Sequence, residues 1–532
     1  MSAVLIKDLE QRWLSLRAEQ VCNVADWAEA ASHVLPHQRN VVQAGISGSP
    51  ANPGKHSVPE RLCSDAEDAN EQLAAGTMEL CTPLDGSWFE FSPAPQIPEE
   101  SKDAVSQWLA DCTERIRSTL QRSNFYSSVH QTYLQRGCFG TTAIFVDSTG
   151  LAPLNFQVWD AGTFVIAENA AGRVDTVMRE IQMTAKQAVE LFGDFAGAKP
   201  IDAFKAGKLT ERFSFIHSIH PTGKGDFESV YWRIGDHSGG PAKVVQHDFF
   251  PAFVGRYLRQ SAQSPYGTSP ALRALPDIRR LNDLELQIAT IVQTMASPRT
   301  IVPAGYEGVV DLRPGGITVG GKTREEDPKE WLTGGRPDFI QNFYDQKRAS
   351  VEERFHKSLF TQFANIEHQI TAREVSARER EKLMRFSPTF TLLTTEVLNP
   401  LLELVFMLEY KTGSLPAAPA EAFYRAPSGP ILLFPSIVQT SRMSLAIQAA
   451  RAQGWAETLE LFAQTPAVLD NIDQDRAFRD IARSKGLAAF LRDESERDDR
   501  RAAAAQQQQM QMAAELAAKN PQAVKTLMDS AA

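Results

Sequence analysis

The sequence predicts an α+β fold, and three observations lead to it. First, residues Leu151–Tyr257 contain many short strand-like runs and only one helical run, Ala185–Phe192, so the strands should pair mainly antiparallel. Second, apolar residues recur every three or four positions over Ala271–Ala296, the spacing of a long helix. Third, residues 298–337 are rich in Gly and Pro with short β-like pieces, and a second helix follows over Phe339–Phe360. A sheet region followed by two helices around a small β module is the expected core.

The remaining elements follow from the same spacing rules. Before the sheet region we expect helices over residues 1–35, 65–80 and 101–135, with Gly137 breaking the last one, and strands at Ser87–Phe91 and Thr141–Asp147. After the second long helix, residues 361–371 lose clear periodicity. A further helix is expected from Ala372, interrupted near Pro388 and resuming to Tyr410, and then a helical C-terminal region from Ser436.

Composition narrows the functional classes. The chain has 532 residues, of which 43% are hydrophobic, enough for a large core, and its net charge is −10. Proteins that grip nucleic acid tightly usually carry a basic excess, so any contact with DNA or RNA should be local or weak. The five cysteines form no C-x-x-C pair, which argues against zinc and for reduced thiols. No metal or cofactor is expected. No membrane span is expected either, because no window of 18 apolar residues occurs.

One motif suggests an enzyme. Residues Gly316–Thr323, GITVGGKT, match the phosphate-loop template G-x-x-x-x-G-K-[ST]. A working phosphate loop must open a helix whose N-terminus supports the phosphates. Here the loop is followed by Glu325, Glu326 and Asp327, and then by Pro328, which disfavours a helical conformation for its predecessor. A P-loop NTPase using Gly316–Thr323 is therefore the alternative hypothesis, and no catalytic residue is expected in the leading one.

The second predicted long helix carries several basic residues. Lys347, Arg348 and Arg354 alternate with acidic residues along the second predicted long helix. They are typical either of a solvated face with ion pairs four residues apart or of a surface that passes near a polyanion.

Five segments, in order along the chain, resemble a known family. Ser123–Asp147 is similar to the "SNFY … FGT" segment of head-to-tail connector, or portal, proteins of short-tailed bacteriophages. The other four are Leu73–Phe91, Tyr266–Glu285, Thr371–Glu381 and Leu398–Pro416. The resemblance covers about residues 1 to 435 and is weak beyond them. One departure is Thr268, where the family often has Arg, so no role is carried over to that side chain.

The resemblance implies a portal architecture with an α/β wing, two stem helices, a clip, a tunnel loop and a helical crown. Its expected boundaries are residues 1–266 for the first part of the wing, 267–297 for the first stem helix, 298–338 for the clip, 339–360 for the second stem helix, 361–371 for the tunnel loop, 372–435 for the rest of the wing, and 436–532 for the crown and C-terminal tail.

The resemblance also implies a function: a homo-oligomeric, dodecameric ring at one capsid vertex that nucleates the procapsid, admits double-stranded DNA during packaging and later serves tail attachment and DNA ejection. The implied partners are the terminase large subunit, a tail adaptor protein, and the major capsid and scaffolding proteins. The implied location is the virion, after assembly in the host cytoplasm.

The same resemblance assigns residues to three surfaces. Gln362, Asn365, Glu367, His368 and Gln369 are expected to line the DNA channel as the tunnel loop. Lys347, Arg348 and Arg354 are expected in the lumen of the stem, and Arg313, Lys322 and Arg324 at the clip surface that contacts a protein partner.

Overall fold

The structure is a computed structural model that describes most of the first 444 residues and short stretches beyond them. The described residues are 3–39, 42, 62–98, 101–147, 154–223, 225–236, 240–259, 261, 263–296, 299–302, 329–331, 337–364, 385–426, 429–444, 478, 497, 500–504, 506–507 and 511. The chain divides into two compact units, Met1–Gln439 and Thr440–Ala532. In the second unit most of the described residues are helical.

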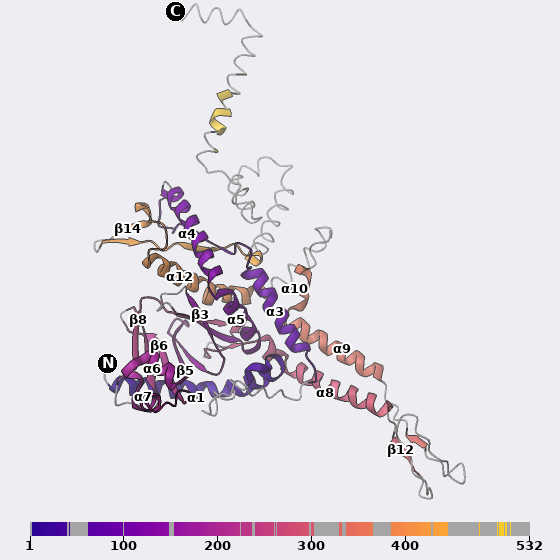
Figure 1. Ribbon diagram of the computed structural model, residues 1–532. Helices are drawn as coiled ribbons and strands as arrows, with labels where there is room; N and C mark the ends of the chain where they lie inside the picture. The colour runs from indigo at the N-terminus through magenta and orange to yellow at the C-terminus, as the bar shows by residue number, and fades with distance from the viewer. Residues whose placement is uncertain are drawn as a thin grey trace, which may run out of the picture. The chain divides into compact units, whose positions relative to one another are not determined.

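The first unit holds the long helices and all of the described sheets (Figure 1). Its α-helices are α1 (Ala3–Val34), α3 (Asp65–Cys81), α4 (Lys102–Arg122), α5 (Phe125–Phe139), α6 (Ala185–Phe192), α7 (Ala198–Lys205), α8 (Pro270–Ala296), α9 (Pro337–Arg354), α10 (Lys357–Ala364) and α12 (Asn399–Lys411). Shorter turns are η1 (Pro36–Gln38), η3 (Gly193–Ala196), η5 (Ala420–Ala422) and the π-helical η4 (Thr394–Leu398), which follows helical residues 385–393.

Every strand pairing among the described residues is antiparallel, as the sequence predicts. A five-stranded sheet has the order β4-β5-β6-β7-β8, a three-stranded sheet the order β3-β2-β9, and four further pairs are β1–β16, β10–β11, β12–β13 and β14–β15. The strands are β1 (Phe89–Ser92), β2 (Thr141–Asp147), β3 (Asn155–Trp159), β4 (Phe164–Glu168), β5 (Val174–Thr184), β6 (Arg212–Pro221), β7 (Phe227–Arg233), β8 (Lys243–His247), β9 (Ala252–Arg256), β10 (Leu258–Arg259), β11 (Gly267–Thr268), β12 (Arg299–Ile301), β13 (Lys329–Trp331), β14 (Phe423–Ala426), β15 (Gly429–Leu432) and β16 (Ser436–Gln439). The predicted α+β class is confirmed.

The N-terminal helix α1 covers the five-stranded sheet. Ile6, Leu9 and Trp13 recur at helical spacing and are buried against apolar side chains of the sheet, among them Trp232 and Met178. Burying one such side chain contributes roughly 1.5–3 kcal/mol, so this stripe holds the first part of α1 against the sheet.

Helices α3 and α5 approach each other closely at the centre of the first unit. A Cβ atom added to Gly137 of α5 would lie 2.1 Å from the Asn70 side chain of α3, so only glycine allows this approach. Gly137 therefore does not end the helix, contrary to the sequence prediction. The helix ends at Gly140, which has φ +76°, a left-handed conformation that favours glycine.

Four other sequence predictions are corrected by the structure. The helix expected over Phe339–Phe360 is divided into α9 and α10 at His356. The helix expected to break near Pro388 continues through it and changes to a π-turn at Thr394–Leu398. The Asn399 amide bonds to Thr394, and a π-turn there accommodates Pro400, which has no N–H of its own. In addition, α7 is a second helix within the strand-rich region, and Ser436–Gln439 is a strand because it pairs with β1.

One helix, Arg385–Lys411, is long and apolar enough among the described residues to cross a membrane by length and composition. Half of its most apolar window is buried in the protein. Leu401, Val405 and Phe406 belong to the core, so the apolar composition is that of a core helix.

Candidate functional site

Helices α8 and α9 form a pair that extends away from the sheets, with β12 and β13 at its far end (Figure 1). Residues 299–301 pair with residues 329–331 in an antiparallel ladder, so the chain that leaves α8 returns beside itself before α9 begins. The predicted helix–β–helix arrangement is thus present in the described residues.

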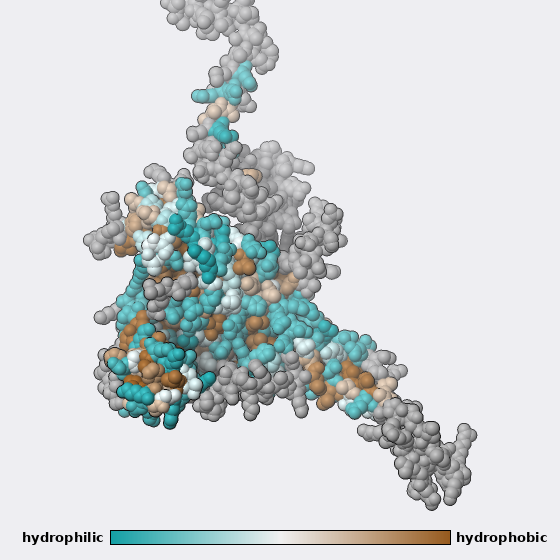
Figure 2. All heavy atoms as spheres, in the orientation of Figure 1, coloured by the Kyte–Doolittle hydropathy of each residue, from teal (hydrophilic) through white to brown (hydrophobic). Residues whose placement is uncertain are grey.

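The far half of α8 exposes apolar side chains. Leu286 and Val292 are each 56% exposed and Met295 is 62% exposed. Figure 2 shows apolar side chains gathered over the part of the α8–α9 pair nearer β12. A helix that exposes several large apolar residues together is typical of a protein–protein contact.

The basic residues of α9 are held by carboxylates of neighbouring helices. Lys347 Nζ lies 2.9 Å from Asp277 Oδ1 of α8, and Arg354 Nε lies 3.5 Å from Asp277 Oδ2. Arg348 Nε lies 3.1 Å from Asp65 Oδ1 of α3. All three cations therefore have acidic partners within their own chain.

Asp65 lies at the centre of a small polar cluster. The Tyr344 hydroxyl donates to Asp65 Oδ2 at 2.7 Å and the Cys63 thiol donates to the same oxygen at 3.0 Å. Burial raises the pKa of Asp65, but these two hydrogen bonds and the charge of Arg348 outweigh it and lower the pKa. Burial and the adjacent Asp65 carboxylate raise the pKa of Cys63, so this thiol is not an activated nucleophile.

The junction of α9 and α10 carries an unusual backbone conformation. His356 has φ +57° and is the one non-glycine residue with positive φ among those described. Its ring lies 5.5 Å from that of Phe386, and burial together with Arg273 and Arg385 lowers the pKa of His356 to about 4. A residue in this conformation costs roughly 1–2 kcal/mol and gives the chain a sharp change of direction.

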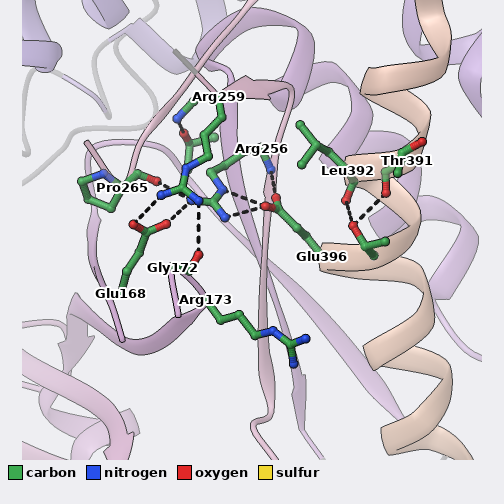
Figure 3. Close-up of polar contacts among 12 residues, drawn as sticks. Glu168, Gly172, Arg173, Arg256, Arg259, Pro265, Thr391, Leu392 and Glu396 are labelled. Carbon is green, nitrogen blue, oxygen red and sulfur yellow. Dashed lines mark hydrogen bonds and ion pairs between the residues drawn. The ribbon is translucent and has the colours of Figure 1, made fainter. Parts of the chain in front are cut away.

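A second charge network joins the sheets to the helix of residues 385–411 (Figure 3). The Arg256 side chain, 4% exposed, pairs with Glu168 of β4 and with Glu396 of the π-turn. Its backbone N–H also donates to Glu396 Oε2 at 2.9 Å. Arg259 donates to the other oxygen of Glu168 at 2.8 Å. The π-turn therefore presents Glu396 directly to β9.

Arg136 of α5 completes this network from the other side. It is 2% exposed and donates to the carbonyl oxygen of Arg256 at 3.0 Å and to that of Thr389 at 2.6 Å. Its guanidinium lies 5.1 Å from the centre of the Tyr257 ring. Burial lowers the pKa of Arg136, and the two carbonyls take the place of a carboxylate partner.

The described residues limit a nucleotide site at Gly316–Thr323. That segment lies outside the described residues, but β13 begins at Lys329. Five residues, 324–328, separate the motif from this strand, whereas a working phosphate loop opens directly into a helix. No group of three or more His, Cys, Asp and Glu suited to a metal ion occurs within the part of the chain that the structure describes.

Comparison with known proteins identifies the family. The sequence profile described as "Bacteriophage head to tail connecting protein" matches residues 6–490.

The chain belongs to the bacteriophage head-to-tail connecting protein family.

Two curated relatives of this connector support the assignment. A "Probable portal protein" of Bordetella phage BPP-1 is 28% identical over 493 residues, covering 88% of this chain and 85% of the relative. The "Portal protein" of Salmonella phage epsilon15 is 24% identical over 503 residues, covering 91% and 87%. Among solved structures, a chain from "Virion of native gene transfer agent (GTA) particle" aligns with a TM-score of 0.36 and 10% identity over 74% of this chain and 85% of that chain.

The segments that carry the sequence resemblance to the connector family meet in the fold wherever they are described. Trp88, from the segment Leu73–Phe91, stacks on Phe125 with ring centres 5.9 Å apart. The Ser269 hydroxyl donates to the Cys138 carbonyl at 2.7 Å. These segments therefore build one core. Thr268, the departure from the family pattern, is 5% exposed.

Of the site residues predicted for the tunnel loop and the clip surface, the structure describes only one. Gln362 lies in α10, which extends to Ala364 and so occupies the beginning of the expected tunnel loop. Asn365, Glu367, His368 and Gln369, as well as Arg313, Lys322 and Arg324, lie outside the described residues.

Sequence reasoning missed the network of Arg136, Arg256 and Glu396. Arg136 and Arg256 are 120 positions apart, and Arg256 and Glu396 are 140 positions apart, so no local spacing could have connected them. The signal available in the sequence was weak: an arginine followed by glycine inside an apolar helix, and a glutamate four residues before Pro400.

Proposed function

We propose that the chain is a portal protein that assembles into a ring at one vertex of the phage capsid and forms the conduit for double-stranded DNA. The match of the connector family across residues 6–490 carries this proposal. The α8–α9 pair around β12 and β13 supports it, because two helices around a small β module correspond to the expected stem and clip. The ring nucleates the procapsid, serves packaging and tail attachment, and is dodecameric.

In this proposal α8 and α9 are the stem helices, residues 298–338 the clip, and residues 361–371 the tunnel loop. Residues 1–266 and 372–435 form the wing, and residues 436–532 the crown and tail. The exposed apolar side chains of α8, Leu286, Val292 and Met295, support packing against further copies.

The proposed channel surface is weakly attractive to DNA. A lumen of free cations would bind the phosphate backbone through counterion release and hinder sliding. Lys347, Arg348 and Arg354, the proposed lumen residues of the stem, instead pair with Asp277 and Asp65. Gln362, Asn365, Glu367, His368 and Gln369 are the proposed contacts of the tunnel loop.

The proposed partners meet the ring at its two ends and at its rim. The terminase large subunit, and later a tail adaptor protein, dock at the clip through Arg313, Lys322 and Arg324. The major capsid and scaffolding proteins contact the outer part of the ring. Assembly takes place in the host cytoplasm, and the finished ring remains in the virion.

The test is the assembly state of the purified chain, alone and co-expressed with its capsid and scaffolding proteins. Light scattering should give a mass of about twelve subunits, and electron micrographs should show rings with a central channel. A compact monomer under every condition, including co-expression, contradicts the proposal.

A further inference from the structure

A cleft of about 640 Å³ opens where α9 meets α10. It is lined by the start of α8, the end of α9, the junction at His356, and the beginning of the helix at Arg385. Its charged lining residues are Arg273, Arg354, Arg385 and Glu353, and Arg354 is already paired with Asp277 of α8. In a chain with a net charge of −10, this is a local reversal of sign.

Some charged and polar groups of the cleft lack partners among the residues that the structure describes. Arg385 lies 3.2 Å from Glu353, but Arg273 has no carboxylate partner among the residues that the structure describes. The Tyr257 hydroxyl, in a side chain 5% exposed, lies near Thr389 without a hydrogen bond of ordinary geometry. The cleft therefore suits an anionic group that also accepts a hydrogen bond.

The opposite face of α9 lies beside an acidic surface. Arg348 and Glu352 border this second surface, whereas Ser350, Glu353 and Arg354 border the cleft. At about 100° per residue, these two sets lie on opposite sides of the helix.

Helix α3 supplies the acidic surface. It contains five carboxylates and no basic residue. Asp65 is engaged by Arg348, but Asp68 and Glu71 are exposed and have no cationic partner within the described ranges. The two lie three residues apart, so they project from the same side of α3.

We propose that the cleft receives helix α3 of a second copy of this chain, so that Asp68 and Glu71 of one subunit face Arg273 and Arg385 of the next. The proposal rests on the ring proposed above and names the surfaces through which its subunits meet. A cyclic ring needs two different, complementary patches on each subunit. Opposite faces of α9 provide such a pair, since each copy can offer α3 to one neighbour and its cleft to the other.

The cleft could also take the phosphate groups of DNA. A second copy is favoured because it satisfies both surfaces at once: DNA would occupy the basic cleft but would leave Asp68 and Glu71 without cations. The experiment below separates the two ligands.

The test reverses the charge of each face separately. The acidic-face variant carries Asp68→Lys and Glu71→Lys, and the cleft variant carries Arg273→Glu and Arg385→Glu. Each should raise the concentration for half-maximal ring assembly at least about tenfold, because like charges then meet at every interface. Asp194→Lys with Asp202→Lys on the η3–α7 segment is the net-charge control for the acidic-face variant, and it should assemble as the unaltered chain does.

Mixing distinguishes lost complementarity from misfolding. In an equimolar mixture, the basic α3 of one variant meets the acidic cleft of the other, and the reverse contact is unaltered, so alternating rings should form at near the original concentration. A misfolded variant cannot be rescued in this way. Light scattering and electron micrographs measure the outcome at low ionic strength, where ion pairs are least screened.

Three outcomes overturn the inference. If the unaltered chain forms rings and both variants assemble equally well, the interface is wrong and the ring stands. If the cleft variant assembles normally but loses binding of a labelled DNA duplex, the cleft is a phosphate site. A chain that never assembles refutes the ring and the interface together.

Discussion

Replacing Glu396 by alanine is the most direct test of the charge network in Figure 3. The substitution removes the acceptor of the Arg256 backbone N–H at 2.9 Å and of Arg256 Nε at 2.9 Å. Arg256 is 4% exposed and would keep only Glu168 as a carboxylate partner.

The expected loss is about 3 kcal/mol. Breaking a buried ion pair by removing one partner costs roughly 3–5 kcal/mol, because the remaining charge is left unpaired. The lower end applies here, since Glu168 still compensates the guanidinium. Glu396→Gln keeps an acceptor oxygen at the same position, and its cost should be about 1–2 kcal/mol.

Hydrogen exchange of the β9 amides is the suitable assay, because it reports the local opening of this strand on its own. A loss of about 3 kcal/mol corresponds to roughly 100-fold faster exchange through local opening. The matched control is Glu190→Ala, which removes an exposed pair with Lys186 and should change exchange by less than about twofold. Exchange in Glu396→Ala within about threefold of the unaltered chain would refute the reasoning.

Four further predictions concern Gly76, His356, the tunnel loop and Lys322. Gly76→Ala should cost about 1–3 kcal/mol and loosen α10, because the new Cβ would lie 2.1 Å from Phe360, and the thermal midpoint measures it. His356 has a folded-state pKa of about 4, below its ordinary 6.5, so stability should fall as the pH drops from 6.5 to 4, and His356→Gln should reduce that acid sensitivity in thermal melts; an unchanged pH profile contradicts it. Deleting residues 365–369 should leave ring assembly intact but impair DNA retention in packaged particles, and normal retention removes the tunnel-loop assignment. Lys322→Ala should leave phosphate release unchanged, whereas a hydrolytic activity lost in that variant would revive the NTPase hypothesis.

The sequence was most informative for helices that bury one apolar face. The stripe of Leu9 and Trp13 predicted α1, and the spacing over Ala271–Ala296 predicted α8, because a helix that buries one face must repeat apolar residues every three or four positions. The resemblance of five segments to portal proteins then indicated the family, which the spacing of apolar residues could not do. Both signals are local in sequence.

The sequence failed where a distant contact overrides a local preference. Gly137 would ordinarily weaken a helix, but the approach of Asn70 makes glycine necessary inside α5. Ser436–Gln439 is a strand only because β1, more than 300 residues earlier, pairs with it. The candidate site behaves in the same way: Asp65 and Asp277, the partners of the predicted lumen cations, lie far from α9 in the chain.

The carboxylate partners Asp65 and Asp277 weaken the attraction of the basic residues of α9 for DNA. A free lysine or arginine contributes to DNA affinity by displacing counterions from phosphates. Lys347 and Arg354 share Asp277, so a phosphate group must compete with a partly buried carboxylate that is already in place. Asp277 also accepts a hydrogen bond from Ser350, and these contacts outweigh burial and lower its pKa, so the carboxylate stays charged at neutral pH. Cations held in this way can border a channel for DNA without binding it tightly, which is what a conduit for a moving polyanion requires.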